Sequence, residues 1–232
     1  MKKFLIIISS LFVLYGCNHD KEKDSEETSS LSENIDRKPP EQVNKEPKNG
    51  QNPENPAEID FMHYFKPAES IATFIGDGNE FASFTEKTTY LSSNYVATII
   101  DNGGAVTMKV YRVDENEILL VMDKLVEGMP EDADYPKIED LDKLPVLDTF
   151  LAGPIEVGTT FKNWSIIETD SELVTPYQTF DDVFIIEETG DGFKNRKYIV
   201  EDYGVVKTEA IMSENSSEQF IVTSTLEDIS LH

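Results

Sequence analysis

From residue 95 onward, short segments rich in β-branched and aromatic residues alternate with turn-forming residues, and this alternation leaves few folds open to the chain. Residues 95–100 and 106–113 are two such segments, and the Asp-Asn-Gly-Gly run at 101–104 between them is typical of a hairpin turn. An acidic run at 114–117 then leads into a third segment at 118–122. Because tight turns join antiparallel neighbours, we predict an antiparallel β-meander.

The same composition recurs after residue 160. Further strands are predicted at residues 161–168, 179–188, 197–201, 205–212 and 219–226. The Thr-Gly-Asp-Gly run at 189–192 is a turn signal between two of them. The predicted fold class is therefore mainly β, an antiparallel meander or half-barrel. The apolar residues at 59–65 open the body as a short helix or a strand, and the pattern does not choose between them.

An acidic, proline-containing stretch interrupts the strand pattern at residues 127–145. Three prolines, at positions 130, 136 and 145, disfavour a regular element there. We predict an irregular acidic connection.

The segments on either side of this connection, 58–126 and 146–232, resemble each other. A Gly-x-x-Phe start occurs at 78–81 and again at 158–161. Two similar β units, produced by duplication, are one interpretation. Coincidence among β-rich segments is the other.

The amino terminus carries a different signal. Lys2 and Lys3 precede an apolar run of roughly a dozen residues, and the chain turns polar directly after Cys17. A short cationic start followed by such a run is typical of a secretory signal peptide. The run is too short for an ordinary transmembrane helix, which needs about 20 apolar residues. Cys17 is the only cysteine, so the chain has no internal disulfide.

The tetrapeptide Leu14-Tyr15-Gly16-Cys17 resembles the lipobox of bacterial lipoproteins, although Tyr15 replaces the small residue usual at its position. In that family the cysteine sulfur receives diacylglycerol, a signal peptidase cuts directly before it, and many members are also acylated on the new amine. The resemblance implies a signal peptide at 1–16, lipidation of Cys17, and a membrane anchor on the extracytoplasmic face. Two acyl chains hold a protein stably on a bilayer.

Residues 17–57 are rich in Lys, Glu, Asp, Ser, Asn and Pro and contain few apolar side chains. Such a composition buries too little apolar surface to offset the entropy of ordering. We predict a lipidated, disordered acidic tether, with an average reach of roughly 35 Å for a flexible coil of this length. The β-rich exported domain then occupies residues 58–232.

The carboxyl-terminal half carries a second resemblance. A Thr-Pro-Tyr-Gln-Thr-Phe run at 175–180 precedes a Tyr-x₅-Gly-x-Val-Lys pattern at 198–207. This order resembles the carboxyl-terminal part of uncharacterised Gram-positive surface lipoproteins, in which Gly stands where this chain has Gln178. The resemblance implies a β-rich exported module in a Gram-positive cell, and no established activity comes with it.

The net charge limits the choice of partners. Residues 58–232 carry 12 basic and 35 acidic residues. A body with this much negative charge repels nucleic acid phosphates and anionic lipid headgroups. We therefore expect no nucleic acid partner. Solubility is one explanation of this charge. Attraction of cations or of a basic partner is the other.

Catalytic and metal-binding side chains are few. The histidines are His19, His63 and His232, and none has the companions of a zinc site or a nucleophile triad. His63 is expected to be a partly exposed structural residue rather than a catalytic base. No catalytic residue is assigned, and no cofactor is predicted. Calcium is the one metal considered, at the acidic runs 77–80 and 131–134, although neither has the spacing of an EF-hand and solvated loops explain both.

Two functions remain open. The first is a non-catalytic envelope module that contacts membrane lipid through Cys17 and binds an envelope protein, a wall component or a small ligand. The second is a carboxylate-dependent hydrolase acting on a cell-envelope substrate, which needs two acidic side chains about 5–10 Å apart across a cleft. A concave pocket in the folded body would favour a ligand-binding role.

Overall fold

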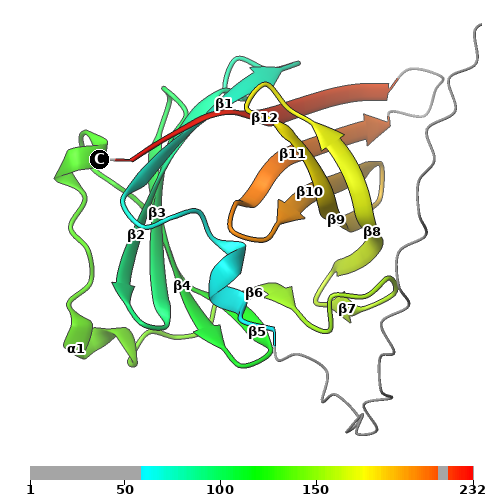
Figure 1. The fold of residues 1–232 in the computed structure, drawn as a ribbon. Helices are drawn as coiled ribbons and strands as arrows, with labels where there is room; N and C mark the ends of the chain where they lie inside the picture. Colours follow the sequence, from blue (N-terminus) through cyan, green and yellow to red (C-terminus); the bar gives the residue numbers. More distant parts are fainter. Residues whose placement is uncertain (1–58, 214–218, 232) are drawn as a thin grey trace, which may run out of the picture. The chain divides into compact units, whose positions relative to one another are not determined.

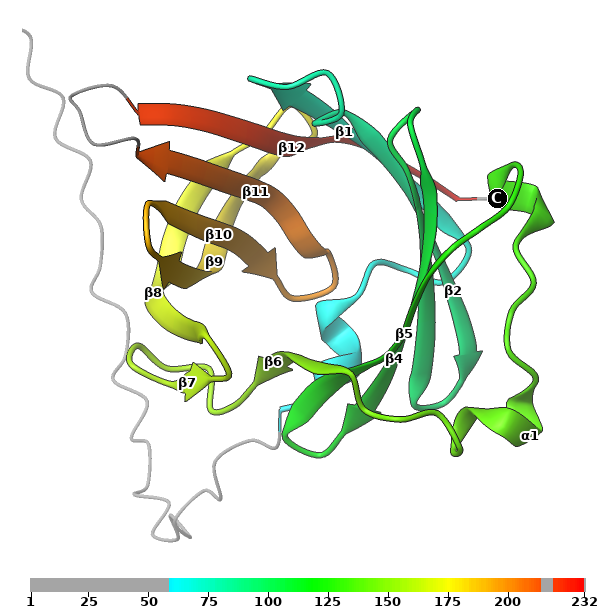
Figure 2. The ribbon, with the colours of Figure 1, turned by 180° about the vertical axis from the view of Figure 1, so that it is seen from behind.

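The strands of this chain pair in one continuous antiparallel sheet that curls into a nearly closed barrel (Figures 1 and 2). This computed structural model describes residues 59–213 and 219–231, in which twelve strands are found. The strands are β1 (Ser70–Asp77), β2 (Phe84–Ser92), β3 (Tyr95–Asp101), β4 (Val106–Asp114), β5 (Glu117–Leu125), β6 (Asp148–Ala152), β7 (Thr160–Phe161), β8 (Trp164–Val174), β9 (Thr179–Gly190), β10 (Phe193–Val200), β11 (Gly204–Ser213) and β12 (Gln219–Leu231).

The sheet order explains how the barrel comes together. From one edge to the other it runs β6-β5-β4-β3-β2-β1-β12-β11-β10-β9-β8-β7, so that every neighbour is consecutive in sequence except the pair β1 and β12. That pair joins strands β1–β6 to strands β7–β12 in a single sheet. The edge strands β6 and β7 come close together where the barrel nearly closes (Figure 2). The prediction of a mainly β, antiparallel fold is confirmed, and the duplication stays a prediction.

The predicted hairpins are confirmed, with three differences. The strands β1, β2 and β6 were not predicted. The strand predicted at 161–168 is split, because the chain turns at Lys162, whose φ of +52° is left-handed, and β7 folds back on β8. The opening residues form a 3₁₀ helix, η1 (Phe61–Tyr64), which Asp60 caps by accepting a hydrogen bond of 2.9 Å from the Met62 amide.

η1 lies inside the curve of the sheet, between β4 and β11. Phe61 and Phe65 are buried there in a cluster with side chains from both halves, including Tyr111 and Phe184. Gly204 makes this packing feasible. Its φ is +59°, and a Cβ at this position would lie 2.8 Å from the Tyr64 carbonyl oxygen, so only glycine fits without strain.

The acidic connection covers the outer face of the sheet. Between β5 and β6 it contains only short helical turns, η2 (Pro130–Asp132) and α1 (Ile138–Leu141), so the predicted irregular structure is confirmed. Leu141 is buried against the outward side chains of β3, β4 and β5, such as Met108 and Val121. Among the described residues, no helix has the length and apolar character needed to cross a membrane.

The predictions made for the signal peptide, for Cys17 and for the tether lie outside the described residues, and so do those for His19 and His232.

Candidate binding cavity

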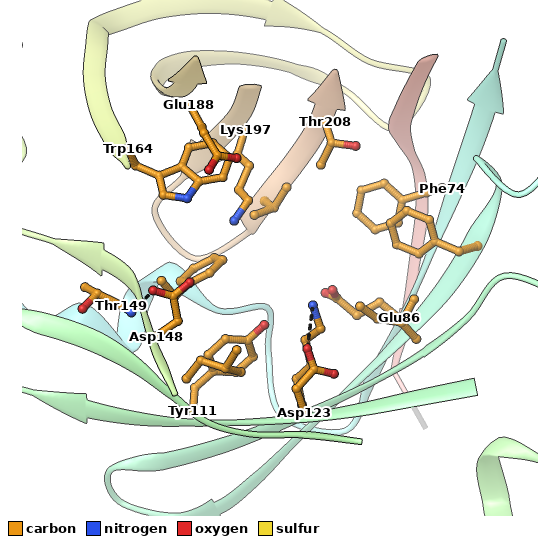
Figure 3. Close-up of a pocket in the computed structure, with 16 residues that line it drawn as sticks. Phe74, Glu86, Tyr111, Asp123, Asp148, Thr149, Trp164, Glu188, Lys197 and Thr208 are labelled. Carbon is orange, nitrogen blue, oxygen red and sulfur yellow. Dashed lines mark hydrogen bonds and ion pairs between the residues drawn. The ribbon is translucent and has the colours of Figure 1, made fainter. Parts of the chain in front are cut away.

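The concave face of the barrel encloses a cavity of about 440 Å³ (Figure 3). This is within the range of small-molecule binding sites. Its walls combine aromatic and charged side chains drawn from both halves of the sheet. The aromatic residues are Phe74, Phe84, Tyr111, Phe150 and Trp164. The charged residues are Glu86, Lys109, Asp123, Asp148, Glu188 and Lys197.

Lys197 is the distinctive residue of this cavity. Its Nζ lies 4.3 Å from the ring centroid of Trp164 and 4.7 Å from that of Phe150, within the range of cation–π contacts. No ion pair or hydrogen bond joins its ammonium group to another of the cavity-lining residues drawn in Figure 3. Burial, together with the nearby charge of Lys109, lowers the pKa of Lys197 to about 8, although Asp148 and Glu188 act in the opposite direction.

Two of the cavity carboxylates already have cationic partners. Asp123 lies 3.8 Å from Lys109 Nζ. Glu86 accepts a hydrogen bond of 2.8 Å from Lys66, whose side chain is only 2% exposed and also donates to the Val205 carbonyl oxygen at 3.0 Å. An ammonium group so deeply buried requires such compensation. Both carboxylates are therefore neutralised by a lysine, and neither adds an unpaired charge to the cavity.

Asp148 and Glu188 are held by neutral donors. Asp148 accepts a hydrogen bond of 2.8 Å from the Thr149 amide, and Glu188 accepts one of 3.1 Å from the Asn195 side-chain amide. Among the residues that line the cavity, neither has a salt-bridge partner (Figure 3). The cavity thus presents one unpaired cation, two unpaired carboxylates and aromatic walls, a set that can orient a small polar molecule with an apolar portion.

Strand alternation decides which charges enter the cavity. Successive side chains of a strand point to opposite faces, so Lys197 faces inward and Arg196 outward. On the outer face Arg196 Nε donates to Glu187 at 2.8 Å, and Arg196 Nη1 lies 3.8 Å from Glu209. Two adjacent basic residues that look equivalent in the sequence therefore have different roles.

Sequence reasoning did not identify Lys197, Trp164, Asp148 or Glu188 as site residues. Lys197, Trp164 and Glu188 lie in predicted strands, where the pattern gives no indication of which face is concave, and Asp148 lies in β6, which was not predicted. The available signal was a lysine one position from an arginine within an alternating strand, which places one of the two charges on the inner face. Sequence alone does not tell which.

His63, which was considered as a base, lies at the end of η1, away from the cavity. Its Nδ1 is hydrogen-bonded to Asp202 in the β10–β11 turn, and its side chain is 49% exposed. This hydrogen bond is the main cause that raises the pKa of His63, with smaller contributions from the charges of Asp60 and Glu201. The contact ties η1 to the β10–β11 turn, consistent with the structural role expected of His63.

The acidic runs considered for calcium bind their own loops. Asp77 accepts a hydrogen bond from the Gly78 amide, and Asn79 from the Phe81 amide. Asp132 accepts one of 2.9 Å from the Met129 amide. Among the described residues, no group of three or more His, Cys, Asp or Glu side chains is placed to hold a metal ion.

A comparison with protein-family models gave no match, and one with curated proteins gave none. Two solved structures are similar in fold. One is a candidate exported protein with a YmcC-like fold from Bacteroides fragilis, at 12% identity and a TM-score of 0.41, covering 72% of this chain and 97% of that one. The other is a candidate lipoprotein from Parabacteroides distasonis, at 12% identity and a TM-score of 0.44, covering 72% of this chain and 98% of that one. Likenesses of this size do not bear on what this chain binds, and the Gram-positive origin stays a prediction.

Proposed function

We propose that this chain is a non-catalytic, extracytoplasmic binding module, anchored in the membrane through Cys17, whose cavity holds a small ligand with an anionic group. The observation that carries this proposal is the position of Lys197, an ammonium group without a carboxylate partner inside an aromatic cavity. The lipobox at residues 14–17 supplies the location.

The charge of Lys197 has a free-energy cost in the cavity, because the ammonium group loses its hydration there. Burial makes the protonated form of Lys197 unfavourable, which is why its pKa falls to about 8. An anion that enters the cavity replaces the lost hydration with a charge-assisted hydrogen bond. The aromatic faces of Trp164 and Phe150 then contact the rest of the ligand. Carboxylates and phosphates are the anions that suit a single ammonium group.

Tryptophan fluorescence offers a direct test, because Trp164 is the only tryptophan of the chain and lines the cavity. We expect saturable changes in emission when butyrate, benzoate or inorganic phosphate is titrated into the purified protein. Affinity should fall as the pH rises above about 8, because Lys197 loses its proton there.

The variant Lys197→Met should abolish this binding. The matched control is Arg196→Met, one residue away on the outer face, which should bind like the wild type. If no anion of the panel binds, or if Lys197→Met and the wild type titrate alike, the proposal is wrong.

The anchor has its own test. We expect the mature protein to begin at a diacylglycerol-modified Cys17, detectable by mass spectrometry of the membrane fraction. The variant Cys17→Ser should leave the membrane fraction. If it stays with the membrane just as firmly, the anchor is wrong, while the cavity proposal is unaffected.

A carboxylate-dependent hydrolase is the second candidate, favoured by the position of Asp148 and Glu188 in the same cavity without cationic partners. Both line the cavity together with Lys197, and the charge of each acts to raise the pKa of Lys197. A hydrolase predicts that the protein releases soluble fragments from purified cell envelope and that Asp148→Asn and Glu188→Gln each stop the release. A wild-type protein that releases nothing eliminates this candidate.

A further inference from the structure

An apolar row continues the cavity face toward the end of β10, β11 and β12. Phe193, Met212 and Phe220 are directly opposite one another across these three strands, Phe193 with Met212 and Met212 with Phe220. Their exposed fractions are 38%, 41% and 52%. We call these three residues the apolar strip. Large exposed side chains gathered in this way are typical of a binding surface.

The apolar strip faces the same side as Lys197. The register of β10 against β9 and β11 is regular from Phe193 to Lys197, so Phe193, Asn195 and Lys197 share one face. Asn195 confirms this, because its side chain donates to Glu188 in the cavity. Four residues of strand, at about 3.3 Å each, place the strip roughly 13 Å from Lys197.

Polarity decreases along this path. Next to Lys197 on the neighbouring strand is Thr208, and one row further out Ala210 pairs with Val222. The apolar strip follows. Phe193 extends it toward β9, since its ring lies across Gly190, where a Cβ would come within 2.1 Å of the ring. A cationic end and an apolar end are thus joined along one continuous face.

We propose that the cavity and the apolar strip together bind a single-chain carboxylate amphiphile, such as a fatty acid, with its carboxylate at Lys197 and its alkyl chain over the strip. This inference rests on the proposed function, since it assigns the ligand class of the same cavity. Lys197 is the one unpaired ammonium group among the residues that line the cavity and lies beside the carboxylates Asp148 and Glu188, so it matches a single anionic head group rather than several. The body as a whole carries 35 acidic and 12 basic residues, which disfavours an anionic membrane surface as the occupant of the strip.

The test compares ligands that differ only in head or tail, titrated into the full mature chain below their aggregation concentrations with Trp164 fluorescence as the readout. We expect palmitate to bind at least about 100-fold more tightly than butyrate. Burial of only a few of the additional methylene groups is enough for this gain in affinity. Hexadecanol, which has the tail without the charge, should bind more weakly than palmitate.

Variants then separate the two ends. Met212→Gln and Phe220→Gln should each lower the affinity for palmitate about tenfold and leave the affinity for butyrate unchanged. Lys197→Met should lower the affinity for both ligands. The matched control is Ile221→Gln, because Ile221 is similarly exposed at 44% and neighbours Phe220 on the opposite face of β12. It should bind palmitate like the wild type.

The outcomes distinguish the two proposals. If butyrate and palmitate bind equally well through Lys197, the ligand class is wrong and the anion-binding cavity stands. If Met212→Gln and Ile221→Gln weaken palmitate to the same extent, the strip is no more than exposed apolar surface, and the inference fails. If no carboxylate binds at all, both proposals fail.

Discussion

Lys197 illustrates how one inward position changes the chemistry of a residue. Lys194, three positions before it on the same strand, is 47% exposed and lies 3.5 Å from Glu187. Lys197 instead contacts two aromatic rings, and burial lowers its pKa to about 8. The side chain of Lys197 is half-buried, and its desolvated, unpaired ammonium group costs stability, a cost that is retained where it serves binding.

We predict that Lys197→Met stabilises the protein near neutral pH by about 1–3 kcal/mol, from the size of the pKa shift. In the unfolded chain the lysine pKa is 10.5, and in the folded protein it is about 8. Between these two pH values the unfolded state binds more protons than the folded state. The contribution of Lys197 to the free energy of unfolding of the wild type therefore rises with pH. The difference in free energy of unfolding between the variant and the wild type should therefore shrink from pH 7 to pH 10.5. Urea unfolding at both pH values measures it, and a gap that stays constant would contradict the assignment.

His63 has the opposite shift. The hydrogen bond to Asp202 raises the pKa of His63 above 6.5. Its stabilising effect is therefore fully present below pH 6.5 and is lost as the pH rises through the raised value. We predict that His63→Ala lowers the Tm by about 1–2 °C at pH 5.5 and by less at pH 8.5. The expected change in Tm is small because the His63–Asp202 pair is exposed. Asp202→Asn should show the same trend in thermal scans, whereas an equal loss at both pH values would exclude ionic pairing.

At the scale of elements, sequence and structure agree where turns are strong. The hairpin turns at 101–104 and 189–192 were predicted correctly, because Gly and Asn there fix a turn without tertiary contacts. β1 and β2 were missed because β1 contains Gly76 and β2 mixes Thr with Glu86 and Lys87, which weakens the strand pattern. Register and curvature, which bring Lys197 and Trp164 together, depend on pairing across the whole sheet and are not encoded in any local run.

The β10–β11 hairpin depends on Gly204. We predict that Gly204→Ala destabilises the domain by about 2–4 kcal/mol, since it combines a left-handed φ with a Cβ placed 2.8 Å from the Tyr64 carbonyl oxygen. Chemical denaturation measures the loss. Gly103 is the control: its φ is also positive, but its Cβ would meet nothing within 4 Å. Gly103→Ala should therefore cost only the backbone strain, and equal losses in both variants would mean that the contact with η1 is unimportant.

At the scale of the whole molecule, the order of strands in the sheet follows the order of the chain except where the first strand pairs with the last. β12, the last strand in sequence, lies in the interior of the sheet between β1 and β11, where it forms eight residue pairs with β1. β6 and β7, which lie near the middle of the chain, form the two edges. The barrel is thus joined in its interior by the terminal strands and left open near the midpoint of the sequence.

This arrangement predicts opposite responses to two cuts. A chain ending at residue 213 lacks β12, so β1 and β11 each lose one of their two pairing partners, and strands β1–β6 lose the ladder that connects them to β7–β11. We expect it to show no cooperative unfolding transition by circular dichroism. A protease site inserted between β6 and β7, at residue 156, cuts no strand pair, because these strands are the unpaired edges of the sheet. After cleavage the fragments should remain one complex by size-exclusion chromatography, held by the β1–β12 ladder and by the cluster that Phe61 shares with Phe184. Fragments that separate on cleavage would mean that each half carries its own stability, as expected of two independent β units rather than one barrel.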